Sequence, residues 1–147
     1  MLKAAGAKGP QRIAYVAGGK LQDEFDFFAG CCSYAGRYVE PLHVIAEELA
    51  DVTTPSKAPG NWGILLRRGL KRGITIWAIS QRWSEADKTA VGNASDFVIF
   101  RQSSGDDVIY LARKTGIEAD SIRGMKPLEY VIKDALTGNV TSGKLKF

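Results

Sequence analysis

Short segments rich in β-branched and aromatic residues alternate along this chain with segments whose apolar residues recur at helical spacing. The strand-like segments are Arg12–Val16, Leu42–Ala46, Ile74–Ile79 and Phe97–Phe100. Gly18-Gly19 ends the first of them, and amphipathic segments follow. Strands that alternate with helices predict an α/β fold, a mostly parallel sheet with helices on both faces.

The carboxyl-terminal part of the chain predicts a different element, a β-hairpin over about residues 129–147. Two strand-like segments, Tyr130–Lys133 and Val140–Lys146, flank the turn residues Thr137-Gly138-Asn139. The length of 147 residues and the 45% hydrophobic content fit one domain over residues 1–147. Ser84 is predicted to cap a helix that continues through Val91.

Composition excludes several classes of protein. One histidine and two adjacent cysteines, Cys31 and Cys32, cannot form a zinc site or a disulfide between them. The longest apolar runs are a few residues, so no membrane span is expected, and we expect a cytoplasmic protein. The net charge of +4 gathers in a basic section from Lys57 to Lys88, which is either a surface for a polyanion or a solvated helix face.

Polar residues directly follow three of the predicted strands. Glu47 and Glu48 follow the second strand, Gln81 follows the third and Arg101 follows the fourth. The carboxyl ends of parallel strands form one rim, where ligands bind in such sheets, so these side chains are predicted to converge. Phosphoryl transfer needs this set: Glu47 to bind a metal, Glu48 to polarise water, and Gln81 to sense a terminal phosphate. The alternative for the glutamates is a solvated strand end that begins a turn.

The segments around these residues resemble a known family. LHVIAEELADVT, followed by LLRRGLKRGITIWAISQRW, resembles the ATPase core of the FtsK–HerA group of P-loop enzymes, which are ring-forming DNA translocases and include viral genome-packaging ATPases. FVIFRQSSGDDVIYLARKTG is similar to the strand-to-helix segment that follows in that group. The resemblance covers about residues 42–116, with a Walker B strand over about 42–48 and a sensor strand over about 74–82. It implies a RecA-like core, ATP and Mg2+ as cofactors, double-stranded DNA as partner, and a homo-oligomeric ring that is most often a hexamer.

Two departures from the family pattern stand out. The Walker B pair is usually Asp-Glu, whereas this chain has Glu47-Glu48, so the metal geometry must adjust to one more methylene. No Walker A loop, Gly-x-x-x-x-Gly-Lys-Ser/Thr, is present, since both near-matches place leucine at the hydroxyl position, Leu21 and Leu145. The chain is therefore predicted to be the part after the phosphate loop, and its nucleotide-binding residues stay unknown. A sheet without the phosphate-loop strand would expose strand edges or an apolar groove.

The resemblance also implies roles for basic residues. In ring ATPases of this group a neighbouring subunit supplies an arginine to the triphosphate, and the candidates are Arg68, Arg72 and Arg101. Arg67 and Lys71 share the basic helix and are candidates for DNA binding. Each of them can also be an ordinary surface cation.

Three functions follow from these observations. The first is a subunit of an ATP-hydrolysing motor that translocates DNA or packages genomes. The second is a standalone, hydrolysis-dead homologue that acts as an interaction or regulatory protein. The third is a basic DNA-binding module without ATP chemistry. The sequence resembles a Mg-ATPase but has no Walker A motif, so enzymatic activity of these 147 residues is left open.

Overall fold

Two of the predicted apolar segments form a parallel pair of strands, β1 (Leu42–Ala46) and β2 (Ile74–Ala78). The structure is a computed structural model that describes residue 9 and residues 11–147 except 57 and 59. Leu42 lies opposite Ile74 and Ala46 opposite Ala78, so the two strands end side by side.

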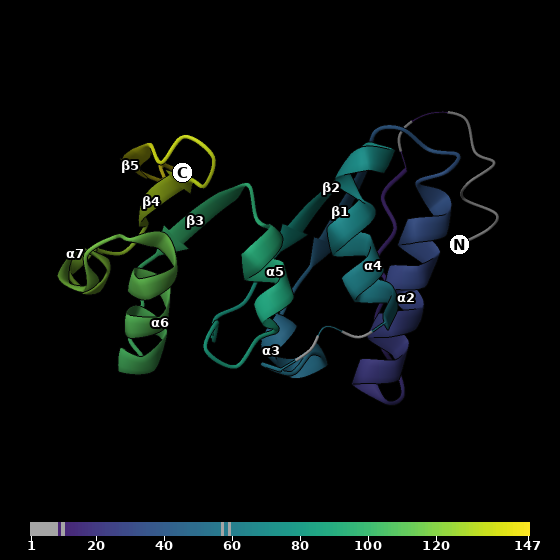
Figure 1. The fold of residues 1–147 in the computed structure, drawn as a ribbon, viewed down its shortest axis with the longest axis horizontal. Coiled ribbons are helices and arrows are strands. Elements are labelled where there is room, and N and C mark those ends of the chain that lie inside the picture. The colour runs from purple at the N-terminus through teal and green to yellow at the C-terminus, as the bar shows by residue number, and fades with distance from the viewer. Residues whose placement is uncertain (1–8, 10, 57, 59) are drawn as a thin grey trace.

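Helices α2 (Leu21–Ala35) and α4 (Gly60–Arg68) cover one face of this pair (Figure 1). Val44 and Ile74 point into the layer, each 2% exposed. They join a core with Phe25 of α2 and Trp62 of α4, whose rings lie 5.0 Å apart. Burial of these large apolar side chains is the main force that holds α2 and α4 to the strands.

A second sheet is built from strands β3 (Asp96–Phe100), β4 (Glu129–Asp134) and β5 (Val140–Lys144), in that order. Its two pairings are both antiparallel. The mixed α/β class and the terminal hairpin are thus observed, but the prediction of a mostly parallel sheet with helices on both faces is wrong for the described residues. The physical reason is that the hairpin strand β4 supplies β3 with five register partners, which satisfies backbone groups that a parallel neighbour would otherwise bond.

The second sheet has its own core under helices α6 (Gly105–Thr115) and α7 (Ala119–Gly124). Ile99 of β3 packs there with Val108 and Ile122. Helix α5 (Lys88–Asn93) lies between the two sheets in Figure 1. Trp83, just before α5, packs against both cores. The remaining helices are short: α3 (Leu49–Val52) and the 3-10 turn η1 (Leu70–Arg72).

The strand predicted at Arg12–Val16 is absent from the structure, in which this segment is irregular. Tyr15 instead packs on α2: its ring stacks on Phe28 at 5.5 Å and its hydroxyl donates to a carboxylate oxygen of Glu24 at 3.0 Å. Strand propensity without a paired edge does not produce a strand, because the backbone hydrogen bonds need a partner. Residues 1–8 of the predicted domain lie outside the described residues. None of the described helices is long and apolar enough to cross a membrane.

Candidate active site

The carboxyl ends of β1 and β2 stay joined beyond the strands themselves. The Ile79 N–H donates to the Ala46 carbonyl at 2.8 Å, and the Leu49 N–H donates to the Ile79 carbonyl at 3.1 Å. Glu47 and Glu48 are the two residues between Ala46 and Leu49, whose backbone groups make these two hydrogen bonds. The β1 end is therefore fastened to the β2 end on both sides of the two glutamates.

Gln81 and Glu48 are in direct contact at this end. The Gln81 side-chain amide donates from Nε2 to Oε1 of Glu48 at 2.8 Å, across 33 residues of sequence. Glu48 has φ 52° and ψ 51°, the left-handed region that side chains other than glycine occupy rarely. Such a backbone conformation persists only where the surrounding structure fixes it, and here the two flanking hydrogen bonds do so.

Glu47 is exposed beside Glu48, and its carboxylate has no hydrogen bond to any described residue. Two adjacent carboxylates suit Mg2+, which usually binds one or two carboxylates together with phosphate oxygens and water. Within the described ranges, no group of three or more His, Cys, Asp or Glu side chains could hold a metal ion by itself. Glu47 and Glu48 could therefore supply one or two oxygen ligands to a magnesium ion, but not a complete ligand set.

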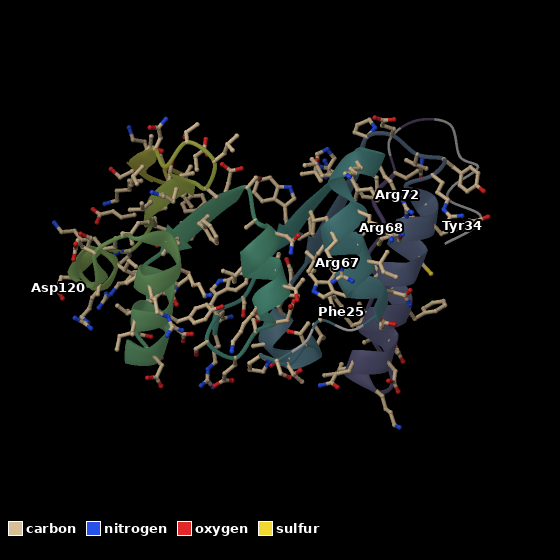
Figure 2. All side chains as sticks on the ribbon, in the orientation of Figure 1. Phe25, Tyr34, Arg67, Arg68, Arg72 and Asp120 are labelled. Carbon is tan, nitrogen blue, oxygen red and sulfur yellow. The ribbon has the colours of Figure 1, made fainter. Side chains whose placement is uncertain are left out.

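The basic residues lie at the other end of the same strands. Arg67 and Arg68 end α4, and Lys71 and Arg72 form η1, which directly precedes β2 (Figure 2). Because Glu48 and Gln81 follow their strands, the structure does not bring these four cations to the predicted rim of the same chain. Arg72 donates from Nη1 to the carbonyl and hydroxyl oxygens of Ser33 at 3.3 and 2.8 Å, which ties it to α2.

Arg101 follows β3 and is exposed. It belongs to the second sheet, whose strands do not pair with β1 or β2 in the described part of the chain. Of the predicted rim residues, Glu48 and Gln81 are thus in contact just beyond the ends of β1 and β2, Glu47 is the chain neighbour of Glu48, and no strand pairing in the described residues brings Arg101 to them.

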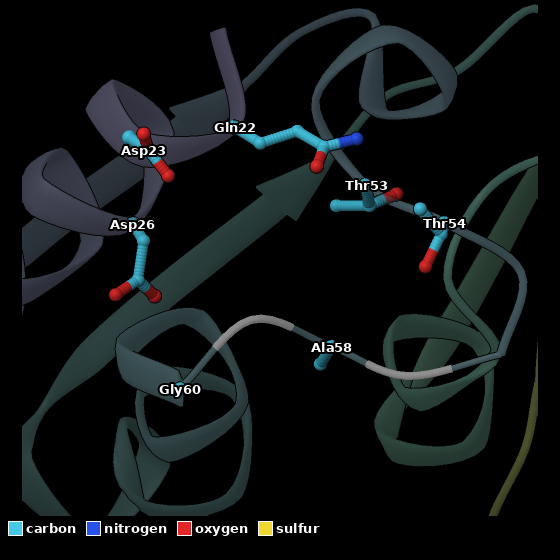
Figure 3. Close-up of a pocket in the computed structure, with 7 residues that line it drawn as sticks. All are labelled: Gln22, Asp23, Asp26, Thr53, Thr54, Ala58 and Gly60. Atoms are coloured by element: carbon cyan, nitrogen blue, oxygen red, sulfur yellow. The ribbon is translucent and has the colours of Figure 1, made fainter. Parts of the chain in front are cut away.

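A polar hollow of about 390 Å3, which sequence patterns do not reveal, lies between the start of α2 and the loop before α4 (Figure 3). Asp26 lines it and caps α4: Oδ1 accepts from the backbone N–H groups of Asn61 at 2.7 Å and Trp62 at 3.3 Å. Carboxylates line the hollow and one already occupies the helix start, so this hollow repels phosphate. The seven lining residues are Gln22, Asp23, Asp26, Thr53, Thr54, Ala58 and Gly60.

Comparison with solved structures identifies the fold. The genome-packaging NTPase B204 of Sulfolobus turreted icosahedral virus 2, solved with AMPPCP, superposes with a TM-score of 0.78 at 14% identity, over 89% of this chain and 65% of B204. The chain has the fold of a viral genome-packaging NTPase. The same protein with ATP-gammaS gives a TM-score of 0.74, and B204 of Sulfolobus turreted icosahedral virus, a DNA-packaging ATPase, gives 0.76 over 90% of this chain and 66% of that one. The predicted resemblance to packaging ATPases is therefore confirmed for the fold.

A sequence comparison finds a similar segment in a phage protein. Protein P9 of Pseudoalteromonas phage PM2 is 46% identical over 59 residues, which make up 40% of this chain and 26% of P9. No protein-family model matches the chain. This chain spans less than two thirds of each B204 chain cited above and matches about a quarter of P9.

Proposed function

We propose that this chain is the part after the phosphate loop of an ATP-hydrolysing motor that packages or translocates double-stranded DNA. The observation that carries the proposal is the 2.8 Å hydrogen bond from Gln81 to Glu48, at the joined ends of β1 and β2, in a chain with a packaging-NTPase fold. A carboxylate beside an amide, both solvent-accessible, can orient a water and contact a phosphate in the same place.

Each residue of this site has one proposed role. Glu48 accepts a hydrogen bond from the attacking water and polarises it. Gln81 holds the Glu48 carboxylate in place and senses the terminal phosphate of ATP through its side-chain amide. Glu47 holds Mg2+, whose charge neutralises the phosphate oxygens when it is bound.

The phosphates of ATP need a cradle of backbone N–H groups and a lysine, which the 147 residues do not contain as a Walker A motif. In this proposal the cradle comes from residues outside them. The carboxylates of Glu47 and Glu48 repel phosphate, so they are suited to the metal and the water, and the phosphate contact at this rim is left to the Gln81 amide.

The basic end of α4 and η1 has separate proposed roles in a hexameric ring in the host cytoplasm. Because Arg68 is exposed and lies at the opposite end of the strands from Glu48, it is placed to reach a neighbouring subunit's site. Arg101 is the second candidate, whereas Arg72 is occupied by Ser33. Arg67 and Lys71 contact the phosphate backbone of DNA, which makes binding strongly dependent on salt.

The test is Glu48→Gln in the full-length motor that carries this sequence and its phosphate loop. We expect ATP hydrolysis to fall by about 100-fold or more, with ATP affinity retained, because the variant keeps the shape but loses the base. Hydrolysis is measured by phosphate release and binding by a fluorescent ATP analogue. Glu118→Gln, the same change at the exposed N-cap of α7, is the matched control and should hydrolyse ATP normally. Wild-type hydrolysis by the Glu48 variant would remove Glu48 from the mechanism.

A further inference from the structure

The one-turn helix α3 begins directly after Glu48, and hydrogen bonds fix its first residue, Leu49, on both sides. The Leu49 N–H donates to the Ile79 carbonyl at the end of β2 at 3.1 Å, and the Leu49 carbonyl accepts from the Thr53 N–H at 3.0 Å. A helix of four residues is not stable by itself, because one turn fixes several backbone dihedral angles for few hydrogen bonds. The position of α3 therefore depends on contacts with the rest of the molecule.

The side-chain hydroxyl of Thr53 makes the contact that ties this turn to the core. It donates to the Leu49 carbonyl at 2.6 Å and accepts from the Asp87 N–H at 3.1 Å. Thr53 is 4% exposed, so water does not compete for these two bonds. The Asp87 carboxylate in turn accepts from the Trp62 ring N–H at 2.9 Å and caps α5. The Thr53 hydroxyl therefore joins the residue after Glu48 to both α4 and α5.

The backbone of Glu48 requires support of this kind. Its φ of 52° and ψ of 51° lie in the left-handed region, which is unfavourable for a residue with a Cβ. Such a conformation persists only where neighbouring contacts fix it. The Glu48 carbonyl accepts from the Asp51 N–H at 2.9 Å, so Glu48 is bonded into the α3 turn. A shift of this turn would move the Glu48 carboxylate away from Gln81 Nε2, which now lies 2.8 Å from it.

We propose that Thr53 is a positioning residue for Glu48: its hydroxyl holds Leu49 in place, and Leu49 fixes the backbone that orients the Glu48 carboxylate. A carboxylate that polarises water must lie within hydrogen-bond reach of that water, and a misplacement of about 1 Å can lower a rate by about 100-fold. The effect on hydrolysis rests on the proposed function. The hold on the Glu48 backbone does not, and it can be measured without ATP.

The experiment is Thr53→Val in the full-length motor that carries this sequence, because valine keeps the branched shape and removes the hydroxyl. We expect kcat for ATP hydrolysis to fall at least about tenfold with KM unchanged, since the interaction lost is one that serves the transition state. Hydrogen exchange of the Leu49 amide, measured without nucleotide, should become at least about tenfold faster, because the turn opens more often. Thr53→Ser keeps the hydroxyl and should restore most of the lost kcat.

Thr115→Val is the matched control, because Thr115 makes the same pair of bonds in the second core. Its hydroxyl donates to the Leu111 carbonyl at 2.8 Å and accepts from the Ile117 N–H at 3.3 Å, and the residue is 6% exposed. This variant loses the same chemical group and should keep the wild-type kcat. An equal fall of kcat in Thr115→Val, or a normal kcat in Thr53→Val, would overturn the proposal. If Thr53→Val does not fold, Thr53→Ala replaces it with the same expected result, because the smaller side chain leaves space for a water at the hydroxyl position.

Glu48→Gln in the same motor separates this inference from the proposed function. Loss of hydrolysis in Glu48→Gln together with normal hydrolysis in Thr53→Val leaves the proposed function standing and overturns the role of Thr53. Normal hydrolysis in Glu48→Gln contradicts the proposed function, and faster exchange at Leu49 in Thr53→Val still shows that Thr53 holds the Glu48 backbone. Unchanged exchange at Leu49 overturns that role whatever Glu48→Gln does.

Discussion

At the scale of single residues, Tyr110 carries a buried hydroxyl group, which costs free energy when it has no hydrogen-bond partner. The side chain is 6% exposed, and its hydroxyl has no hydrogen-bond partner in the described structure. Burial raises the pKa of this phenol above its ordinary value of 10.0, so the group is neutral at pH 7. We expect Tyr110→Phe to raise the free energy of unfolding by about 1 kcal/mol, because it removes an unpaired polar group at little cost in volume.

Urea denaturation followed by circular dichroism measures this change. Tyr38→Phe is the control, since Tyr38 is 71% exposed and its hydroxyl makes only a surface contact with Tyr34; its stability should stay within about 0.5 kcal/mol of the wild type. A clear loss of stability in Tyr110→Phe would mean that the hydroxyl has a partner, such as a buried water.

The residues of the site show what local sequence can and cannot specify. The polar residues after two strands could be predicted to meet, because parallel strands end at the same edge, and Glu48 and Gln81 do meet at 2.8 Å. The left-handed backbone of Glu48 could not be predicted, since glutamate has no preference for it and tertiary hydrogen bonds impose it. The link from Arg72 to Ser33 spans 39 residues and has no local signal. The catalytic roles themselves stay predictions.

At the scale of elements, Asp87 joins three helices. Its carboxylate accepts from the Thr89 N–H at 2.6 Å, which caps α5, and from Trp62 Nε1 of α4 at 2.9 Å. Its own N–H donates to the Thr53 hydroxyl at 3.1 Å, just after α3. Asp87 is 0% exposed, so Asp87→Ala loses a cap and leaves a buried indole N–H unpaired. We expect a loss of about 2–4 kcal/mol in the free energy of unfolding.

Chemical denaturation checks the effect of Asp87→Ala against Asp120→Ala, in the first turn of α7. The Asp120 side chain is 94% exposed and pairs with Arg123 on the surface, so its removal should change stability by less than about 0.5 kcal/mol. Equal effects of the two variants would show that the buried network contributes nothing beyond surface charge.

The start of α5 also shows how far local signals specify an element. Ser84 and Asp87 are both good N-cap residues, and the sequence favours the earlier one, at the start of a longer helix. The structure uses Asp87, whose carboxylate accepts from the Thr89 N–H, because residues 83–85 form a turn that does not continue into α5; the Ser84 N–H in this turn donates to the carboxylate of Asp107, 23 residues away. Two adjacent serines, Ser103 and Ser104, precede α6, and the Ser104 hydroxyl accepts from the Asp107 N–H and caps the helix. Caps without tertiary competitors can be read from sequence, and those with competitors cannot.

At the scale of the whole molecule, strand pairing is what the sequence specifies least. The segments that become β3 and β4 are separated by 28 residues, from Arg101 to Leu128, and nothing local states that they pair antiparallel. The alternation of strands and helices favours a parallel neighbour for β3, and β2 ends only 17 residues before β3 begins (residues 79–95). The antiparallel partner β4 is nevertheless the one that pairs with β3, across the longer connection. Pairing is decided by the free edges available when the chain folds, which is a property of the complete sheet.

The two cores of the molecule share one large side chain, Trp83, which packs against both. We expect Trp83→Ala to lower stability by about 3 kcal/mol and to separate the unfolding of the two cores, because the shared contact couples them. Native-state hydrogen exchange measures the opening free energy of the β1–β2 amides and of the β3–β4 amides independently. We expect the same opening free energy for both strand pairs in the wild type and two different values in Trp83→Ala. Trp83→Phe keeps an aromatic ring between the cores and should preserve the coupling. A single opening free energy for all strands in Trp83→Ala would show that α5 and the backbone couple the two cores without this side chain.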